Sequence, residues 1–196
     1  MSKYIWENIM KNKGFVLDDN NITLLDSIFK EKEIKKNEFF FKQGDKSTEV
    51  AFIRKGVFRS FYIDKKGDDI TKYFYAEESV LFSYVAYLTN KESSYYIQAV
   101  EDSCILVAKV SDFEKIIKDN YNLLSFYKKL LDEVIVMKEE HACSFKLLNS
   151  LERYEQFKIM YPDLEQRIKQ HHLASYLGIT PVSLSRIRNR GKINKW

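Results

Sequence analysis

The sequence predicts an α+β fold with three parts: a β-roll, one long helix, and a small helical unit that contains a helix-turn-helix. Three observations lead to this prediction. Short aromatic and β-branched runs separated by turn residues fill much of residues 39–108, as in a β domain. Apolar residues then recur at alternating spacings of four and three between Leu123 and Leu148, which is typical of a long helix. Finally, two short helical patterns meet at Gly178.

The N-terminal half is expected to begin with a helix and to continue in strands. Residues 21–30 space Ile22, Leu25 and Ile28 as on one helix face, and Asn21 can cap that helix. Runs of strand length follow at 39–41, 50–53, 57–63, 70–75, 95–100 and 104–108. They are separated by turn signals at 43–45, 54–56 and 64–68. Because several hairpins in one domain must hide their edges, a small barrel or roll is predicted.

From Tyr121 the chain is expected to form one long helix with two apolar faces. The first face is a heptad-like seam made of Leu123, Tyr127, Leu130, Val134, Met137 and His141. A second stripe beside it contains Leu124, Leu131, Ile135, Ala142 and Phe145. Such a helix can pack on the β-roll and also pair with a second copy, so we expect a homodimer joined along the first seam. A helix buried wholly within one chain is the alternative.

Near the end of the chain, the residues that end one helix and begin the next are those of a helix-turn-helix. A further helix is expected over 151–160, where it would pack behind the helix-turn-helix. Gly178 can take the positive φ that ends a helix, Thr180 can cap the next one, and Pro181 is favoured at a first helical position. On the second helix Leu184 and Ile187 face inward. The outer face carries residue types that contact DNA, because Arg can bind guanine and Asn can bind adenine through paired hydrogen bonds. The predicted DNA-binding residues are Thr180, Val182, Ser183, Ser185, Arg186, Arg188, Asn189, Arg190 and Lys192.

Charge supports this interpretation. The net charge is only +4, but residues 169–196 contain six Lys or Arg residues and no Asp or Glu. A local cationic patch attracts a polyanion while the rest of the molecule stays nearly neutral. Double-stranded DNA is therefore the expected partner, and a homodimer would favour a palindromic operator. An ordinary helical hairpin with a solvated basic face is the competing explanation.

The order of these parts resembles the CRP/FNR family of bacterial transcription regulators. Residues 43–45, 53–56 and 64–67 look like the glycine turns of the family's cyclic-nucleotide-binding-type jelly roll, a double-stranded β-helix, and residues 179–188 look like its recognition element. The resemblance implies a sensor domain at 1–120, a dimerisation helix at 121–146 and a winged helix-turn-helix at 147–196. It also implies a homodimer whose sensor shifts the DNA-binding domains, with RNA polymerase as a partner if the protein activates transcription. Arg186 matches the family's recognition-helix Arg.

The effector site departs from the family pattern. Members that bind a cyclic nucleotide carry a Gly-Glu pair and then an Arg-Ser or Arg-Thr pair, and the aligned positions here are Phe82-Ser83 and Ser93-Ser94. We expect these four residues to mark the effector pocket, inside or beside the helix-like insertion at 79–88. The competing explanation, which the periodicity alone favours, is a plain packing helix that plugs the mouth of the barrel. Without an Arg the cyclic phosphate lacks its charge-assisted bidentate partner, so cyclic AMP is not the expected ligand.

No cofactor and no metal site are predicted. Cys104 and Cys143 are the only cysteines, whereas an iron–sulfur cluster needs about four thiolates. Haem sensing would need an axial His or Cys in the sensor domain; all three histidines follow that domain, and Cys104 is expected to be a core residue of a strand. His171 and His172 are adjacent, so on a helix they point in different directions and make a poor metal site.

Other function classes are weaker. A cupin-like enzyme would need histidines on strands, and none precedes His141, so the protein is not expected to be an enzyme. A small-molecule-binding module whose helical tail makes protein contacts is the alternative function, and the acid-free cationic tail argues against it. The residues before Met10 show no basic flank followed by an apolar run, and no apolar stretch is long enough to span a membrane. A cytoplasmic protein is expected.

Overall fold

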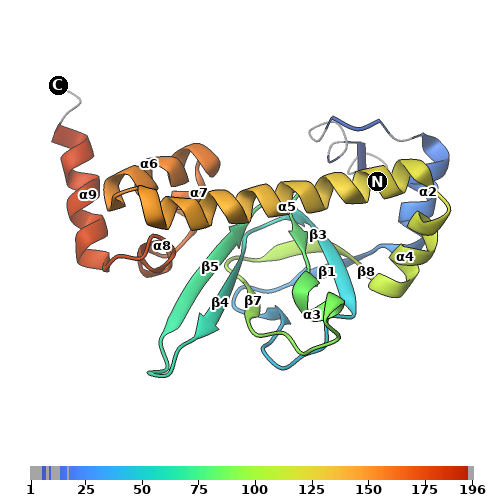
Figure 1. The fold of residues 1–196 in the computed structure, drawn as a ribbon, viewed down its shortest axis with the longest axis horizontal. Coiled ribbons are helices and arrows are strands. Elements are labelled where there is room, and N and C mark those ends of the chain that lie inside the picture. Colours follow the sequence, from blue (N-terminus) through green and yellow to red (C-terminus); the bar gives the residue numbers. More distant parts are fainter. Residues whose placement is uncertain (1–5, 8, 10–13, 17, 194–196) are drawn as a thin grey trace.

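Two four-stranded antiparallel sheets pack against each other in the N-terminal half (Figure 1). The computed structural model describes residues 6–7, 9, 14–16 and 18–193, and their side chains as far as Asn189. One sheet has the order β1 (Lys30–Ile34), β8 (Ser103–Lys109), β3 (Glu49–Lys55) and β6 (Val80–Leu81). The other has the order β2 (Phe39–Phe41), β7 (Tyr96–Ala99), β4 (Phe58–Ile63) and β5 (Asp69–Tyr75). The predicted β domain is thus confirmed as an antiparallel β-sandwich.

Apolar side chains from both sheets form the core of the sandwich. Phe58 and Ile97 from one sheet meet Ile53 and Ile105 from the other, and all four are buried. The six strands expected from aromatic and β-branched runs are present. The sequence did not reveal β1, because four of its five residues are charged and exposed. It also did not reveal β6, which has only two residues.

Helices α2 (Asp19–Ile28) and α4 (Val110–Lys118) close one end of the sandwich (Figure 1). The expected first helix begins two residues earlier than predicted. Its cap is Asp18, which accepts the Asn21 N–H at 2.8 Å. Asn21 is therefore inside the helix, where it is buried and accepts a hydrogen bond from Asn120.

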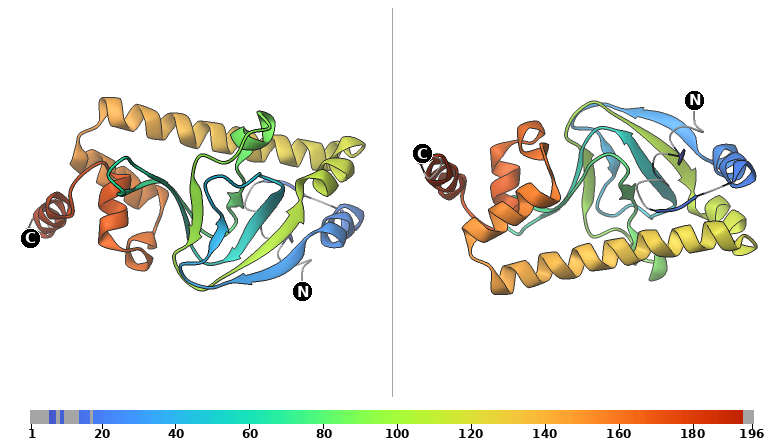
Figure 2. Two further views of the ribbon diagram at one scale, coloured as in Figure 1. Left: turned by 90° about the horizontal axis from the view of Figure 1, so that it is seen from below. Right: turned by 90° about the horizontal axis from the view of Figure 1, so that it is seen from above.

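A single helix, α5 (Tyr121–Leu147), runs along the molecule with the sandwich against its N-terminal half and middle (Figures 1 and 2). Leu123 and Leu130 are buried among residues of the sandwich, including Phe52. Tyr127 packs against the same cluster, and Val134 and Met137 line a cavity between the helix and the sandwich. His141 lies against Tyr73 and Tyr176, with ring centroids 5.1 and 4.8 Å away.

The predicted dimer seam was therefore wrong. Its residues face the sandwich and the C-terminal helices of the same chain, so a second copy cannot reach Leu123 or Leu130. The second apolar stripe is more exposed to solvent: Leu124 is 45 % exposed and Ile135 is 63 % exposed. Both stripes have helical spacing, and only the position of the sandwich decides which of them is buried.

Four helices follow α5: α6 (Ser150–Met160), α7 (Leu164–Arg167), α8 (Gln170–Tyr176) and α9 (Pro181–Ile193). A capping box formed by Asn149 and Glu152 begins α6. The wing implied by the family resemblance is not found, because the described residues after Lys109 contain no strand. The residues between α5 and α8, where such a hairpin would lie, form α6, α7 and short turns instead. None of the described helices is both long and apolar enough to cross a membrane.

Candidate nucleic-acid interface

Helix α9 projects from the end of the molecule farthest from α2 and α4, and one of its faces is open (Figure 1). Leu184 is fully buried and Ile187 is nearly so, as predicted for the face that packs inward. Val182 is 62 % exposed, and further exposed side chains of predicted DNA-binding residues are those of Ser185, Arg186 and Asn189. The side chains of Arg190 and Lys192 lie outside the described residues.

The first turn of α9 is fixed by Thr180. Its hydroxyl oxygen accepts the Ser183 N–H at 3.1 Å and lies 3.0 Å from the Ser183 hydroxyl. Its backbone carbonyl accepts the Leu184 N–H at 3.0 Å. Thr180 is exposed and Ser183 is half-buried, and both are occupied in capping the helix.

Residues 177–180 turn the chain from α8 into α9, and Gly178 makes this turn possible. Gly178 has φ +67°, and its N–H bonds to the Ser175 carbonyl at 3.0 Å. A Cβ at this position would lie 2.6 Å from Cε1 of Phe145. The aromatic ring on α5 thus sits directly against the turn, and a larger residue would both strain the backbone and displace the ring.

Arg186 and Arg188 have different environments. The Nε atom of Arg188 lies 2.5 Å from Oε1 of Glu165, and the Tyr154 hydroxyl donates to the same carboxylate at 2.8 Å. The Arg188 side chain is 27 % exposed. Arg186 is exposed and has no ion pair with any residue that the structure describes. The sequence predicted a DNA contact for both arginines, and it held no signal that would select Glu165 as a partner of Arg188.

Helix α8 packs on strand β5, a contact that the sequence did not predict. The Thr71 N–H donates to Oγ of Ser175 at 2.9 Å, and that hydroxyl lies 3.4 Å from the Asp69 carbonyl oxygen. Apolar residues of both parts, including Phe74 and Tyr176, share one buried cluster. The helical unit is therefore anchored to the edge of the sandwich.

Three ionisable residues, Arg59, Asp69 and His172, lie in the contact between α8 and β5. The buried guanidinium of Arg59 pairs with Asp69 at 2.6 Å, and Nδ1 of His172 lies 3.8 Å from the other oxygen of that carboxylate. Burial, followed by the positive charge of Arg59, lowers the pKa of His172 to about 4. His172 is therefore neutral at neutral pH and serves as a packing residue on α8.

Arg167 makes a second link between the helical unit and the sandwich. Its guanidinium donates to both carboxylate oxygens of Glu77, at 2.7 and 2.9 Å, and also to Glu101. Burial opposes ionisation of Glu77, but Arg167 and the Gly56 N–H outweigh it and hold the pKa of Glu77 at about 2. The bidentate pair of Arg167 and Glu77 restricts how the helical unit can turn relative to the sandwich.

A cavity of about 60 Å³ lies between α5 and the sandwich. Of the four residues predicted for the effector pocket, Phe82 lines this cavity, and the three serines are not among its lining residues. Ser83 and Ser93 are buried and their hydroxyls bond each other at 3.2 Å, while Ser94 is exposed.

Comparisons with known proteins agree with this architecture. The family model described as the cyclic nucleotide-binding domain matches residues 31–120. The fumarate and nitrate reduction regulatory protein of Vibrio cholerae is 27 % identical over 190 residues, which covers 90 % of this chain and 74 % of that protein. Regulatory protein HlyX of Actinobacillus pleuropneumoniae is 25 % identical over 189 residues, covering 90 % of this chain and 78 % of that protein.

Solved structures show the same fold. FixK2 from Bradyrhizobium japonicum matches with a TM-score of 0.73 at 15 % identity, covering 85 % of this chain and 86 % of that chain. A CooA variant from Carboxydothermus hydrogenoformans matches with a TM-score of 0.69 at 17 % identity, covering 87 % and 78 %. The chain is thus similar to CRP/FNR regulators in sequence and in fold, and its residues 31–120 match the cyclic nucleotide-binding domain. Its relatives named here are regulators and not enzymes.

The cavity and the two cysteines limit which ligands and cofactors the chain could hold. The described lining of the cavity contains no Arg, so it offers no guanidinium to a cyclic phosphate. Cys104 and Cys143 are both free, and burial raises the pKa of the Cys104 thiol to about 11. Two thiols, one of them held protonated by burial, do not fit an iron–sulfur cluster.

Proposed function

We propose that this chain is a transcription regulator of the CRP/FNR type that binds specific DNA sequences as a homodimer through the open face of α9. The observation that carries this proposal is the composition of that face. Arg186 and Asn189 are exposed on it, close to Val182, and no Asp or Glu occurs from Thr180 to Trp196. A helix with these side chains offers hydrogen-bond donors and an apolar contact to base edges without repelling phosphates.

The two described arginines of α9 have separate roles. Arg186 is free to make a bidentate contact with a guanine, as the family resemblance also implies. Arg188 is paired with Glu165, so it fixes α9 against the helices behind it. Thr180 and Ser183 set the start of the helix and present their hydroxyls close to where a phosphate would pass.

The homodimer is proposed to form along the second apolar stripe of α5. Three of its residues return to nearly the same side of the helix and are exposed, namely Leu124, Ile135 and Ala142, while Leu131 also lines the cavity beside the sandwich. Pairing two copies along this stripe would bury apolar surface that a single chain leaves in water. Functionally, we divide the chain into a sensor domain at 1–120, a dimerisation helix at 121–146 and a DNA-binding domain at 147–196.

Selection of binding sites from a random duplex pool tests this proposal. We expect the purified full-length protein to enrich a two-fold symmetric site whose half-sites lie about one DNA turn apart. The selection is run with and without a low-molecular-weight cell extract, so that a missing effector does not resemble a lack of DNA binding. Failure to enrich any site under either condition, from protein that is folded and dimeric, contradicts the proposal.

A further inference from the structure

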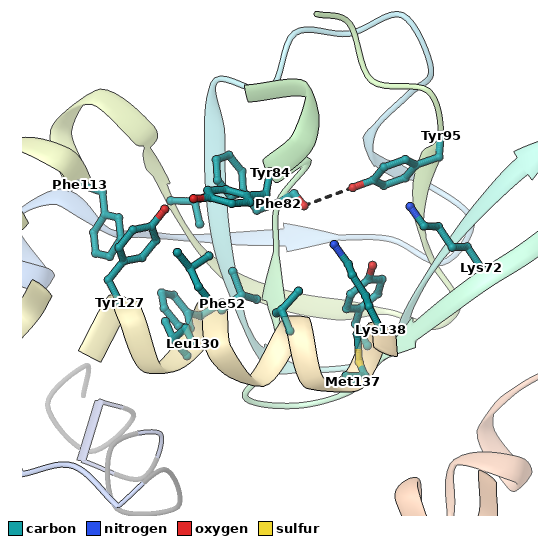
Figure 3. Close-up of a pocket in the computed structure, with 15 residues that line it drawn as sticks. Phe52, Lys72, Phe82, Tyr84, Tyr95, Phe113, Tyr127, Leu130, Met137 and Lys138 are labelled. Carbon is teal, nitrogen blue, oxygen red and sulfur yellow. Dashed lines mark hydrogen bonds between the residues drawn. The ribbon is translucent and has the colours of Figure 1, made fainter. Parts of the chain in front are cut away.

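The cavity between α5 and the sandwich has two chemically different ends (Figure 3). One end is apolar and aromatic, and its walls include Phe52, Phe113 and Leu130. The other end holds two lysine ammonium groups, from Lys72 on β5 and Lys138 on α5. An elongated molecule that is apolar at one end and charged at the other would match both.

The two lysines form a positive end without a compensating acid. The described lining of the cavity contains no Asp or Glu. The Nζ atom of Lys72 lies 4.1 Å from the ring centroid of Tyr95, whose hydroxyl in turn donates to the Phe82 carbonyl at 3.3 Å. Burial and the neighbouring charge of Lys72 both lower the pKa of Lys138. Two adjacent ammonium groups in a half-buried site raise the energy of the empty protein, and an anion between them would relieve it.

Size limits the occupant. A cavity of about 150 Å³ is known to hold a benzene molecule, and this one has about 60 Å³. An aromatic acid is therefore too large for the cavity at this backbone geometry. A cyclic nucleotide is larger still. With a carboxylate placed at the half-buried lysine end, the enclosed part of the cavity holds an aliphatic chain of about two or three carbons.

We propose that this cavity binds a short-chain carboxylate, with its carboxylate between Lys72 and Lys138 and its hydrocarbon chain toward Phe52 and Leu130. The role of this ligand as an effector rests on the proposed function, but its binding does not. Lys72 adjoins Thr71, whose N–H binds Ser175 of α8. The carboxylate would thus be held one residue from the contact that anchors the helical unit to the sandwich.

Calorimetric titration of the full-length protein without DNA tests the binding. The probes are butyrate and its uncharged analogue butyramide, which has nearly the same shape. We expect butyrate to bind at least tenfold more tightly than butyramide. Equal binding of the two, or no binding of butyrate, overturns the proposal. Because no DNA is present, a negative titration does not contradict the DNA-binding proposal. A failed DNA selection likewise does not contradict the binding of a carboxylate in this cavity.

Substitutions of the two lysines test whether they bind the carboxylate. Lys138→Met retains most of the side-chain length but removes the charge, and it is expected to abolish the preference for butyrate. Lys129→Met changes an exposed lysine of the same helix and serves as the matched control, with binding unchanged. If Lys138→Met does not fold, Lys72→Met gives the same test from the opposite wall. A folded variant of either lysine that keeps the full preference overturns the assignment. Tighter binding of phenylacetate than of butyrate overturns the size limit.

Discussion

At the scale of single residues, position within the fold decides what a charge does. Arg186 and Arg188 belong to the same cationic run, and the sequence predicted DNA contact for both. The structure pairs Arg188 with Glu165, a residue of α7 that no sequence pattern connects to it. Pairings of this kind depend on how separate helices pack. Sequence reasoning can identify a basic face, but it cannot identify which member of that face is already engaged.

His172 provides a pH test of the contact between α8 and β5. Its pKa is lowered from 6.5 to about 4 in the folded protein, so the unfolded chain binds more protons between these values. The contribution of His172 to stability is therefore complete above pH 6.5 and is lost as the pH falls toward 4. Between pH 6.5 and about 5 we expect a loss of roughly 1–2 kcal/mol from this group.

Urea denaturation at neutral pH and near pH 5 measures this effect. His172→Gln should show a smaller drop in the free energy of unfolding than the wild type. His171→Gln changes the exposed neighbour and should retain the full drop. Identical pH dependence in the wild type and in His172→Gln would show that burial of this imidazole does not matter to stability.

At the scale of elements, apolar periodicity located α5 and its two stripes, and aromatic and β-branched runs between turn residues located six of the strands. It did not choose correctly between the stripes. Tyr127 and Leu130 are spaced as in a coiled-coil seam, but the same spacing serves a helix lying on a β-sandwich. The choice depends on which side the sandwich occupies, and that is a property of the tertiary fold.

Ile135 and Val136 allow a matched test of the corrected stripe. They are adjacent, 63 % and 54 % exposed, and point about 100° apart on the helix. Ile135→Glu places a charge in the proposed dimer contact and should shift the protein to monomers in sedimentation at micromolar concentration. Val136→Glu introduces the same charge outside that contact and should leave the dimer intact. A dimer that survives Ile135→Glu with unchanged affinity would exclude this stripe as the contact.

At the scale of the whole molecule, the sandwich and the helical unit are joined by more than α5. Ser175 of α8 accepts from β5, and Arg167 of α7 binds Glu77 and Glu101 of the sandwich. Both links lie between residues far apart in sequence, and their polar side chains follow no periodic pattern. The sequence therefore predicted the β domain, the long helix and the helical unit in their order, but not the contacts that hold the helical unit against the sandwich. These links set the position from which α9 projects.

Removing Arg167 should loosen this arrangement. Arg167→Ala leaves Glu77 and Glu101 close together without their shared cation, and we expect a loss of about 1–3 kcal/mol in stability. Hydrogen exchange should become faster at Thr71 and in α8 relative to the sandwich core. Arg54→Ala removes another arginine–glutamate pair, with Glu31 on β1, and is expected to leave exchange in α8 unchanged. Equal exchange in α8 for both variants would mean that Arg167 does not anchor the helical unit.

The most direct test of the account compares binding-site selection by the wild type, Arg186→Ala and Arg188→Ala. We predict that Arg186→Ala loses preference at one base pair of each half-site, at a cost of about 1–3 kcal/mol in binding, and keeps the rest of the site. Arg188→Ala should select the wild-type site with lower affinity for every sequence, because Arg188 positions the helix. If Arg186→Ala selects the same site as the wild type with the same preference at every position, the open face of α9 does not read DNA in the way proposed here.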